Sequence, residues 1–308
     1  MTDHSRQAAC IYLHIMNKIA LFPVLLCERF GARTLPREPE PDLVMDDPDQ
    51  VAAYDQAGSI DGLMASAYLF HSARISQVIQ GCKEVVDLGC GPAIQLCQIA
   101  QLNPEISFHG VDLSPTMLDN ARENVARLRL KNVRFSLGDI TELGFLPDAS
   151  ADGIISTMAL HHLPTLNHLR RCFREVSRVL RPGGALYLVD FNRFKRLKTV
   201  IFMAYQNARH QPHLFTLDYE RSMRAAFDQA EFKAVAREDL PERFEVTSTF
   251  MVPMLTIIKS EDSPIQAAQR DRVRAVLQAM PARYRSDLND LRIFFRLGGL
   301  KNDPFQGL

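Results

Sequence analysis

The chain has 308 residues, of which 46% are hydrophobic and 23% charged, so it is neither disordered nor too small to bury a full core. Its 36 basic and 36 acidic side chains cancel, which argues against nucleic acid or an anionic membrane as a partner. The six cysteines, none in a CxxC pair, indicate free thiols in a reducing compartment, and we expect a cytoplasmic protein.

Residues 1–50 are predicted to form an N-terminal helix followed by an extended linker. The apolar stretch over residues 11–26 is interrupted by polar residues and a proline, so it is too short and too polar to span a bilayer. Residues 31–50 are rich in proline and acidic residues, a composition typical of linkers. No secretory signal pattern is recognised. We therefore expect the main domain to occupy residues 51–260.

The middle of the chain alternates short β-rich runs with amphipathic helical runs, which predicts a parallel sheet covered by helices on both faces. A helix over residues 60–79 precedes the first strand. Strands are predicted at 84–88, 106–112, 133–138, 152–157 and 184–190, and helices at 92–102, 115–129 and 166–180. Ser114 and Pro115 supply an N-cap and a first helical position for the second of these helices.

The pattern changes after the fifth strand, where residues 191–240 form an insertion expected to cover a substrate. Asp228 and Glu231 are spaced as a capping box that opens a helix there. Two strands then follow at 243–249 and 253–259, too close in sequence for a parallel crossover, which predicts an antiparallel hairpin. Residues 261–308 are predicted to be a helical extension, with a helix start at Ser263-Pro264 and an end at Gly298-Gly299.

A glycine turn follows the first predicted strand, in the segment Glu84-Val-Val-Asp-Leu-Gly-Cys-Gly-Pro-Ala93. Gly89 and Gly91, on either side of Cys90, let the backbone bend sharply and approach a ligand closely. Asp87 at the strand end is suited to a cationic amino group. A dinucleotide site would have glycine in place of Ile94, and an acid before the turn would repel a pyrophosphate. The turn therefore favours a ligand without phosphates.

Two further aspartates end the next strands. Asp112 stands about twenty residues after the turn, where a carboxylate can accept both hydroxyls of a ribose. Asp139 follows the third strand, where it could meet an adenine amino group while Ile140 packs on the ring. Any one of these aspartates could instead be an N-cap or turn residue. Three at successive strand ends favour a nucleoside with a cationic group.

These segments, together with residues 159–164 (ALHHLP) and 180–184 (LRPGG), resemble the class I S-adenosylmethionine-dependent methyltransferase family over about residues 54–260. The resemblance implies a seven-stranded sheet in the order 3-2-1-4-5-7-6 with strand 7 antiparallel. It also implies S-adenosyl-L-methionine as cofactor and S-adenosyl-L-homocysteine as product. No metal is expected. The expected cofactor residues are Asp87, Gly89, Cys90, Gly91, Asp112, Leu113, Met117, Asp139, Ile140, Thr157 and Met158.

By the same resemblance, Asp87 with the two glycines would hold the methionine part, and Thr157 and Met158 would line the sulfonium. Methyl transfer is an in-line displacement, so the protein mainly aligns the reactants and excludes water. Where the acceptor must lose a proton, His161 or His162 is the candidate base. Each histidine could instead pack against a helix or cap a loop.

The acceptor should be sought in the elements that cover the carboxyl ends of the strands. The candidate residues are Tyr54, Tyr68, His71, Phe191, Asn192, Arg193, Tyr205, His210 and His213. Aromatic residues at helical spacing also pack in cores, so many of these could be structural. The leading prediction is methylation of oxygen or nitrogen in a small metabolite. A peptide or protein side chain is the second choice, and a cofactor-binding scaffold without turnover is the non-enzymatic one.

Other functions fit the residues less well. Ser156-Thr157-Met158-Ala159 replaces the Asn-Pro-Pro-Tyr type of motif used in DNA amino-methylation. Arsenic methylation would need several cysteines at the site, and no third one accompanies Cys90 and Cys97. A nicotinamide dehydrogenase is disfavoured by Ile94. The terminal helices could shape a peptide groove or pack as a homodimer interface, and the sequence leaves both open.

Overall fold

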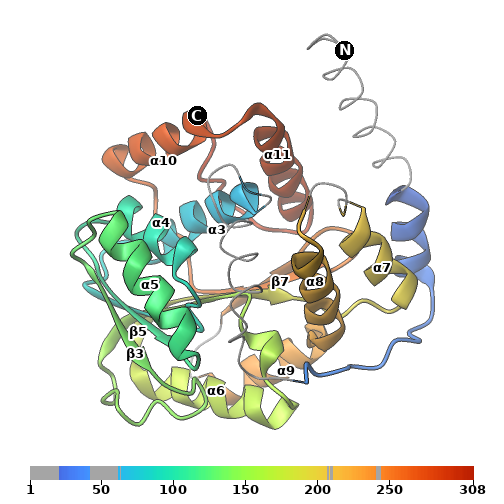
Figure 1. The fold of residues 1–308 in the computed structure, drawn as a ribbon, viewed down its shortest axis with the longest axis horizontal. Coiled ribbons are helices and arrows are strands. Elements are labelled where there is room, and N and C mark those ends of the chain that lie inside the picture. Colours follow the sequence, from blue (N-terminus) through green and yellow to red (C-terminus); the bar gives the residue numbers. More distant parts are fainter. Residues whose placement is uncertain (1–20, 42–61, 63, 207, 209–210, 241–243) are drawn as a thin grey trace.

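The structure of the protein, a computed structural model, describes residues 21–41, 62, 64–206, 208, 211–240 and 244–308 (Figure 1). Its centre is a seven-stranded sheet in the order β3-β2-β1-β4-β5-β7-β6. Strand β7 runs antiparallel to both β5 and β6, and the other neighbours are parallel. The strands are β1 (Glu84–Leu88), β2 (Ser107–Asp112), β3 (Val133–Leu137), β4 (Ala151–Thr157), β5 (Leu180–Phe191), β6 (Glu245–Ser248) and β7 (Leu255–Lys259). The predicted fold class and strand order are confirmed.

Helices cover both faces of the sheet. One face carries α3 (Ala65–Val78), α4 (Ile94–Leu102) and α5 (Pro115–Arg127), with α10 (Ala267–Ala279) and α11 (Ala282–Leu297) beyond α3 (Figure 1). The other carries α6 (Leu166–Val179) and α9 (Gln229–Asp239). The 3-10 turn η1 (Leu160–His162) and the helices α7 (Leu197–Tyr205) and α8 (His213–Ala225) complete the described elements. This layering brings the carboxyl ends of β1 to β5 to one edge.

Alternation along the central strands divides the core into two apolar layers. Val85 and Ile155 pack into the layer under α3 and α4, whereas their neighbours Val86 and Ile154 pack into the layer under α6 and α9. Successive strand residues point to opposite faces, so a strand covered on both sides must be apolar throughout. The buried run in β1 therefore rigidly positions the residues that follow it.

Several local predictions are confirmed by hydrogen bonds. The Met117 amide donates to the Ser114 hydroxyl at 3.0 Å, which caps α5. Asp228 and Glu231 form both bonds of the capping box at the start of α9. The predicted start at Ser263-Pro264 is wrong, because α10 begins at Ala267 and the Ser263 amide donates instead to the Gln77 carbonyl beside the end of α3.

The described part of the N-terminal segment packs against the main domain. Residues 21–30 are helical and residues 32–40 are extended, as their prolines predict. The amides of Thr34 and Leu35 donate to the Lys195 carbonyl at 2.8 and 2.9 Å, and the Glu38 amide donates to the Arg224 carbonyl at the end of α8. We call residues 33–40 the N-terminal strap. In Figure 1 it passes around the outside of α7 and then beneath α8.

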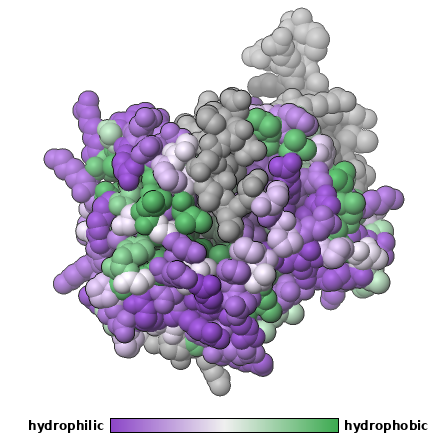
Figure 2. Space-filling view, turned by 60° about the horizontal axis from the view of Figure 1, so that its bottom comes forward, coloured by the Kyte–Doolittle hydropathy of each residue, from purple (hydrophilic) through white to green (hydrophobic). Residues whose placement is uncertain are grey.

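Hydrophilic residues dominate the face of the molecule in Figure 2, and the apolar residues on it form small separate groups. Large exposed apolar side chains include Leu197, Ile201 and Tyr205 of α7. No helix in the part of the chain that the structure describes is long and apolar enough to cross a membrane.

Candidate active site

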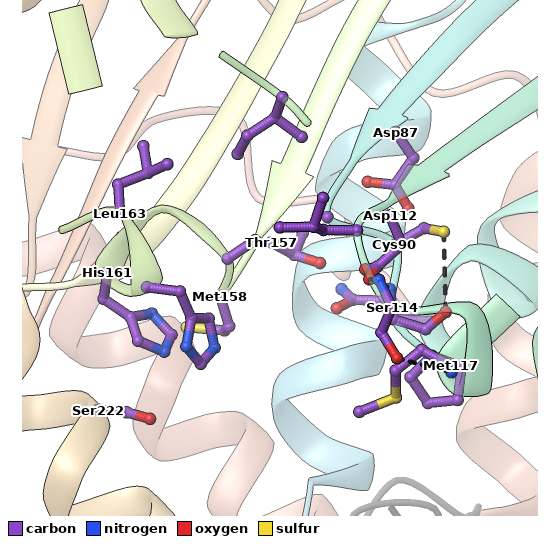
Figure 3. Close-up of a pocket in the computed structure, with 18 of the residues that line it drawn as sticks. Asp87, Cys90, Asp112, Ser114, Met117, Thr157, Met158, His161, Leu163 and Ser222 are labelled. Carbon is purple, nitrogen blue, oxygen red and sulfur yellow. Dashed lines mark hydrogen bonds between the residues drawn. The ribbon is translucent and has the colours of Figure 1, made fainter. Parts of the chain in front are cut away.

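A cavity of about 270 Å³ opens at the carboxyl edge of the sheet. Figure 3 shows that its lining has two halves. Asp87, Asp112 and Met117 lie on one side and His161 and Ser222 on the other, with Thr157 and Met158 between them. All eleven residues predicted for the cofactor line this cavity, as do His161 and His162. Residues from five strand ends thus converge on one space.

The glycine turn between β1 and α4 has the backbone that its sequence predicts. Gly89 has φ +71°, and a Cβ there would lie 2.4 Å from the Ala159 side chain, so both conformation and space require glycine. Gly91 has φ +51° and no atom within 4 Å of where a Cβ would stand. The backbone is therefore open to close approach by a ligand at Gly91.

Asp87 is a buried carboxylate whose Oδ1 has no hydrogen-bond partner among the described residues. Only 4% of the residue is exposed. Burial, followed by the negative charge of Asp112, raises the pKa of Asp87 to about 8. An orphaned carboxylate oxygen facing a cavity is suited to a cationic ligand group, which would satisfy it and restore its ionised form.

Asp112 ties the glycine turn to the end of β2. The Gly91 amide donates to its Oδ2 at 2.7 Å, and the Ser114 amide donates to its Oδ1 at 2.9 Å. Burial raises the pKa of Asp112, although these two hydrogen bonds act in the opposite direction. A carboxylate has about four acceptor positions, so each oxygen can still accept a hydroxyl. Asp112 can thus hold a diol while it shapes the turn.

The remaining cofactor candidates surround the same half of the cavity. Asp139 accepts from the Thr141 amide at 2.7 Å, which fixes the turn after β3 and sets Ile140 against the cavity. Met158 has φ +54°, a strained conformation for a residue with a side chain, directly after β4. The orphan oxygen of Asp87, the open Gly91 and the acceptors of Asp112 together fit the polar groups of S-adenosylmethionine.

His161 belongs to a buried dyad in the second half of the cavity. Its Nδ1 lies 2.7 Å from Asp190 Oδ1 at the end of β5, and its amide donates to Asp190 Oδ2 at 3.1 Å. A carboxylate only accepts, so Nδ1 carries a proton, and in the neutral ring Nε2 presents a lone pair. The residue is 2% exposed, so Asp190 fixes both the tautomer and the orientation of the ring.

His162 has a different partner, which comes from the N-terminal strap. Its Nδ1 forms an ion pair with Glu40 at 2.9 Å, and the Ser222 hydroxyl of α8 donates to Glu40 at 3.0 Å. Burial disfavours ionisation of Glu40, but the hydrogen bond and charge of His162 outweigh it and lower the pKa of Glu40 to about 2. Burial alone would lower the pKa of His162, but the hydrogen bond and the charge of Glu40 raise it.

Only some of the residues predicted to contact the acceptor line the cavity. Tyr68 and Phe191 line the cavity. Tyr54 and His210 lie outside the described residues. The other five do not line the cavity. His71 is buried against the Tyr187 hydroxyl, Asn192 lies beside Thr256, Arg193 pairs with Asp228 and Glu231, Tyr205 bonds Glu220, and His213 is exposed. Local packing and surface ion pairs account for these residue types.

Several lining residues were not among the predictions. One face of α8 supplies Phe215, Asp218, Tyr219 and Ser222. Asp218, Tyr219 and Ser222 stand three, four and seven residues after Phe215, a spacing that places all four on one face of a helix. The spacing was visible in the sequence, but the start of the helix was not. Glu40 and Asp190, which contact His162 and His161 but do not line the cavity, were also missed.

Comparison with known proteins finds methyltransferases. Residues 85–184 match the family model of a methyltransferase domain. The chain is 39% identical over 109 residues to an arsenite methyltransferase of Halobacterium salinarum, covering 34% of this chain and 26% of that protein. It is 26% identical over 153 residues to a demethylmenaquinone methyltransferase of Tropheryma whipplei, covering 50% of this chain and 60% of that one. The chain thus spans about a quarter to three fifths of these relatives.

The fold has close counterparts among solved structures. A methyltransferase from Aquifex aeolicus, described as S-adenosylmethionine-dependent, superposes with a TM-score of 0.50 at 17% identity, over 70% of this chain and 98% of that one. At this identity the similarity shows the fold. Residues 85–184 therefore match a methyltransferase domain in sequence, and the sheet has the strand order of the class I methyltransferase fold.

Proposed function

We propose that the protein transfers the methyl group of S-adenosylmethionine to an oxygen or nitrogen atom of a small molecule. The observation that carries this proposal is the division of the cavity. Carboxylates that suit the cofactor line one half, an oriented histidine lines the other, and Thr157 and Met158 lie between them (Figure 3). An acceptor beside His161 would face the methyl group in line with the carbon–sulfur bond.

In the cofactor half, Asp87 binds the amino group of the methionine part and Asp112 accepts the ribose hydroxyls. Asp139 and Ile140 contact the adenine, and Leu113 and Met117 complete the apolar walls of this half. When bound, S-adenosylmethionine supplies a methyl group activated by the positive sulfur. The protein therefore needs to orient the two reactants and keep water out, rather than activate the carbon.

In the acceptor half, His161 is the base that the geometry favours. Its Nε2 presents a lone pair, and Asp190 stabilises the ring once it is protonated. His162 instead pairs with Glu40, which raises the pKa of His162 and so disfavours it as a proton acceptor. Among the described lining residues, Cys90 alone has a thiol, and burial raises its pKa. These features support oxygen or nitrogen rather than arsenic as the acceptor atom.

The test is incubation of the protein with isotope-labelled S-adenosylmethionine and a small-molecule extract, followed by mass spectrometry. The proposal predicts that one or more small molecules gain one labelled methyl group, and that Asp112→Ala strongly reduces the gain when the cofactor concentration is near the wild-type Kd. Transfer to peptides alone would replace the small-molecule assignment with a peptide substrate. Tight cofactor binding with no transfer to either class would indicate a scaffold and contradict the proposal.

A further inference from the structure

Five aromatic rings form a continuous surface in the acceptor half of the cavity. His162, His161, Phe191, Tyr219 and Phe215 follow one another with ring-centroid separations of 4.2, 5.3, 5.4 and 6.2 Å. All five line the cavity, and we call them the acceptor wall. Such a surface binds the apolar body of a ligand, and the faces of its phenyl and phenol rings attract a cation.

One carboxylate stands on the same stripe of α8 as Phe215 and Tyr219. Asp218 lines the cavity, and no hydrogen bond or ion pair involving its carboxylate is found within the described ranges. Burial, and then the nearby charge of Glu40, raises the pKa of Asp218, whereas His162, His161 and Arg221 lower it by smaller amounts. Asp218 is thus a half-buried carboxylate that stands beside an aromatic surface and has no direct ion pair within the described ranges.

The charges around the acceptor wall select against an anionic ligand. Glu40 pairs directly with His162, whereas Asp218 has no such direct partner in the described part of the chain, and the burial and Glu40 effects on its pKa exceed those of His162, His161 and Arg221. Arg171 is the only Arg or Lys among the described residues that line the cavity, and its guanidinium pairs with Glu142 on the cofactor side. A carboxylate or phosphate on the acceptor would therefore meet like charge, whereas an ammonium would meet Asp218.

A second buried group faces the same space. His161 is 2% exposed, and Asp190 occupies its Nδ1. Among the residues that the structure describes, no hydrogen bond to its Nε2 is found, and the ring lines the cavity. It is therefore available to take a proton from whatever lies on the acceptor wall.

We infer that the acceptor is an apolar amine, whose ammonium group is held by Asp218 and the acceptor wall and deprotonated by His161. This inference rests on the proposed function and narrows its acceptor to nitrogen. The ammonium first transfers one proton to His161 Nε2. The lone pair of the resulting amine then forms the nitrogen–methyl bond while the carbon–sulfur bond breaks and its electron pair goes to sulfur. The products are a methylated ammonium and S-adenosylhomocysteine, and His161 releases its proton to water.

The test compares three ligands of the same shape and different charge on protein saturated with S-adenosylhomocysteine. The ligands are phenethylammonium, 2-phenylethanol and 3-phenylpropionate, and their Kd values are measured by calorimetry or ligand-observed NMR. The wild type is expected to bind the ammonium about tenfold more tightly than the alcohol, since a charge-assisted hydrogen bond contributes about 1.5 kcal/mol or more. The anion is expected to bind most weakly.

Variants of Asp218 make the test specific. Asp218→Asn should bring the Kd of the ammonium close to that of the alcohol and leave the alcohol unchanged, whereas Asp218→Glu should keep the preference. Asp119→Asn, on the exposed face of α5, is the matched control and should behave as the wild type. If the anion binds as tightly as the ammonium or more tightly, or if Asp218→Asn keeps the wild-type preference, the amine inference is overturned and the proposed function still stands. Failure of the wild type to bind S-adenosylhomocysteine would overturn the proposed function as well.

Discussion

At the scale of single residues, Asp87 lowers the stability of the free protein and favours binding. Burial and Asp112 raise its pKa to about 8, well above the ordinary value for an aspartate. The unfolded chain loses this proton at a lower pH than the folded protein does. Between about pH 4 and pH 8 the folded state therefore loses stability as the pH rises. A bound ammonium group would remove this penalty.

Asp87→Asn should stabilise the ligand-free protein, and more so at higher pH. The gain in the free energy of unfolding should grow from about 1.5 kcal/mol at pH 5 toward an upper bound of about 4 kcal/mol at pH 7. Urea unfolding at the two pH values measures it. The same variant should bind S-adenosylmethionine more weakly. A gain that is identical at both pH values would show that the charge of Asp87 is not the cause.

Asp190→Asn should lower kcat by about a hundredfold, because His161 would lose the carboxylate that sets its tautomer and stabilises its cation. The Kd of S-adenosylmethionine should stay close to that of the wild type, since Asp190 lies on the acceptor side. Turnover and calorimetry on the same preparation separate these effects. His213→Gln, which alters an exposed histidine of α8, is the control. Equal kcat in both variants would remove His161 as the base.

At the scale of elements, the positions of the strand ends could be predicted from the sequence. The face of α8 that points into the cavity could not. Asp87, Asp112 and Asp139 end predicted strands, and parallel strands bring their carboxyl ends together, so their convergence followed from the sequence. On α8, each residue turns about 100° from the last, so an uncertain helix start leaves the inward face undefined. His213 of α8 was therefore chosen by residue type, whereas Phe215 and Asp218 of the same helix line the cavity.

The packing of the N-terminal strap could not be predicted from the sequence either. Its prolines predicted an extended chain, but no local pattern indicated what it would pack against. Arg37 holds it in place by donating to the carbonyls of Ala225, Pro164, Leu163 and His161, while its guanidinium stacks on Phe227 at 3.8 Å. Burial lowers the pKa of Arg37 to about 10. The strap thus connects η1 to the end of α8 and carries Glu40 to His162.

Arg37→Ala should destabilise the protein by about 2–4 kcal/mol, because several carbonyls lose a charged donor. Without this anchor Glu40 should lose its fixed position, so KM for the acceptor should rise while the Kd of S-adenosylmethionine changes little. Thermal unfolding and steady-state kinetics measure the two effects. Arg122→Ala removes an exposed arginine with one surface ion pair and should change neither by much. Similar behaviour of the two variants would contradict an anchoring role.

At the scale of the whole molecule, two sources gave the predicted fold. The alternation of strands and helices and the hairpin of β6 and β7 came from residue spacing, whereas the strand order came from the resemblance to a family. The extensions at both ends pack on this core: α11 stacks Phe295 on Phe70 of α3 at 5.1 Å, and Glu40 of the strap pairs with His162. A homodimer remains a prediction.

The central claim, that the cavity binds S-adenosylmethionine through its carboxylates, is tested most directly by calorimetry on the wild type and two aspartate variants. Asp112→Ala removes the acceptors for the ribose hydroxyls and for the Gly91 amide, so its Kd should be about a hundredfold higher, equivalent to about 3 kcal/mol. Its melting temperature should change little. Asp119→Ala, on the exposed side of α5, should bind as the wild type does. Unchanged affinity in Asp112→Ala would contradict the account.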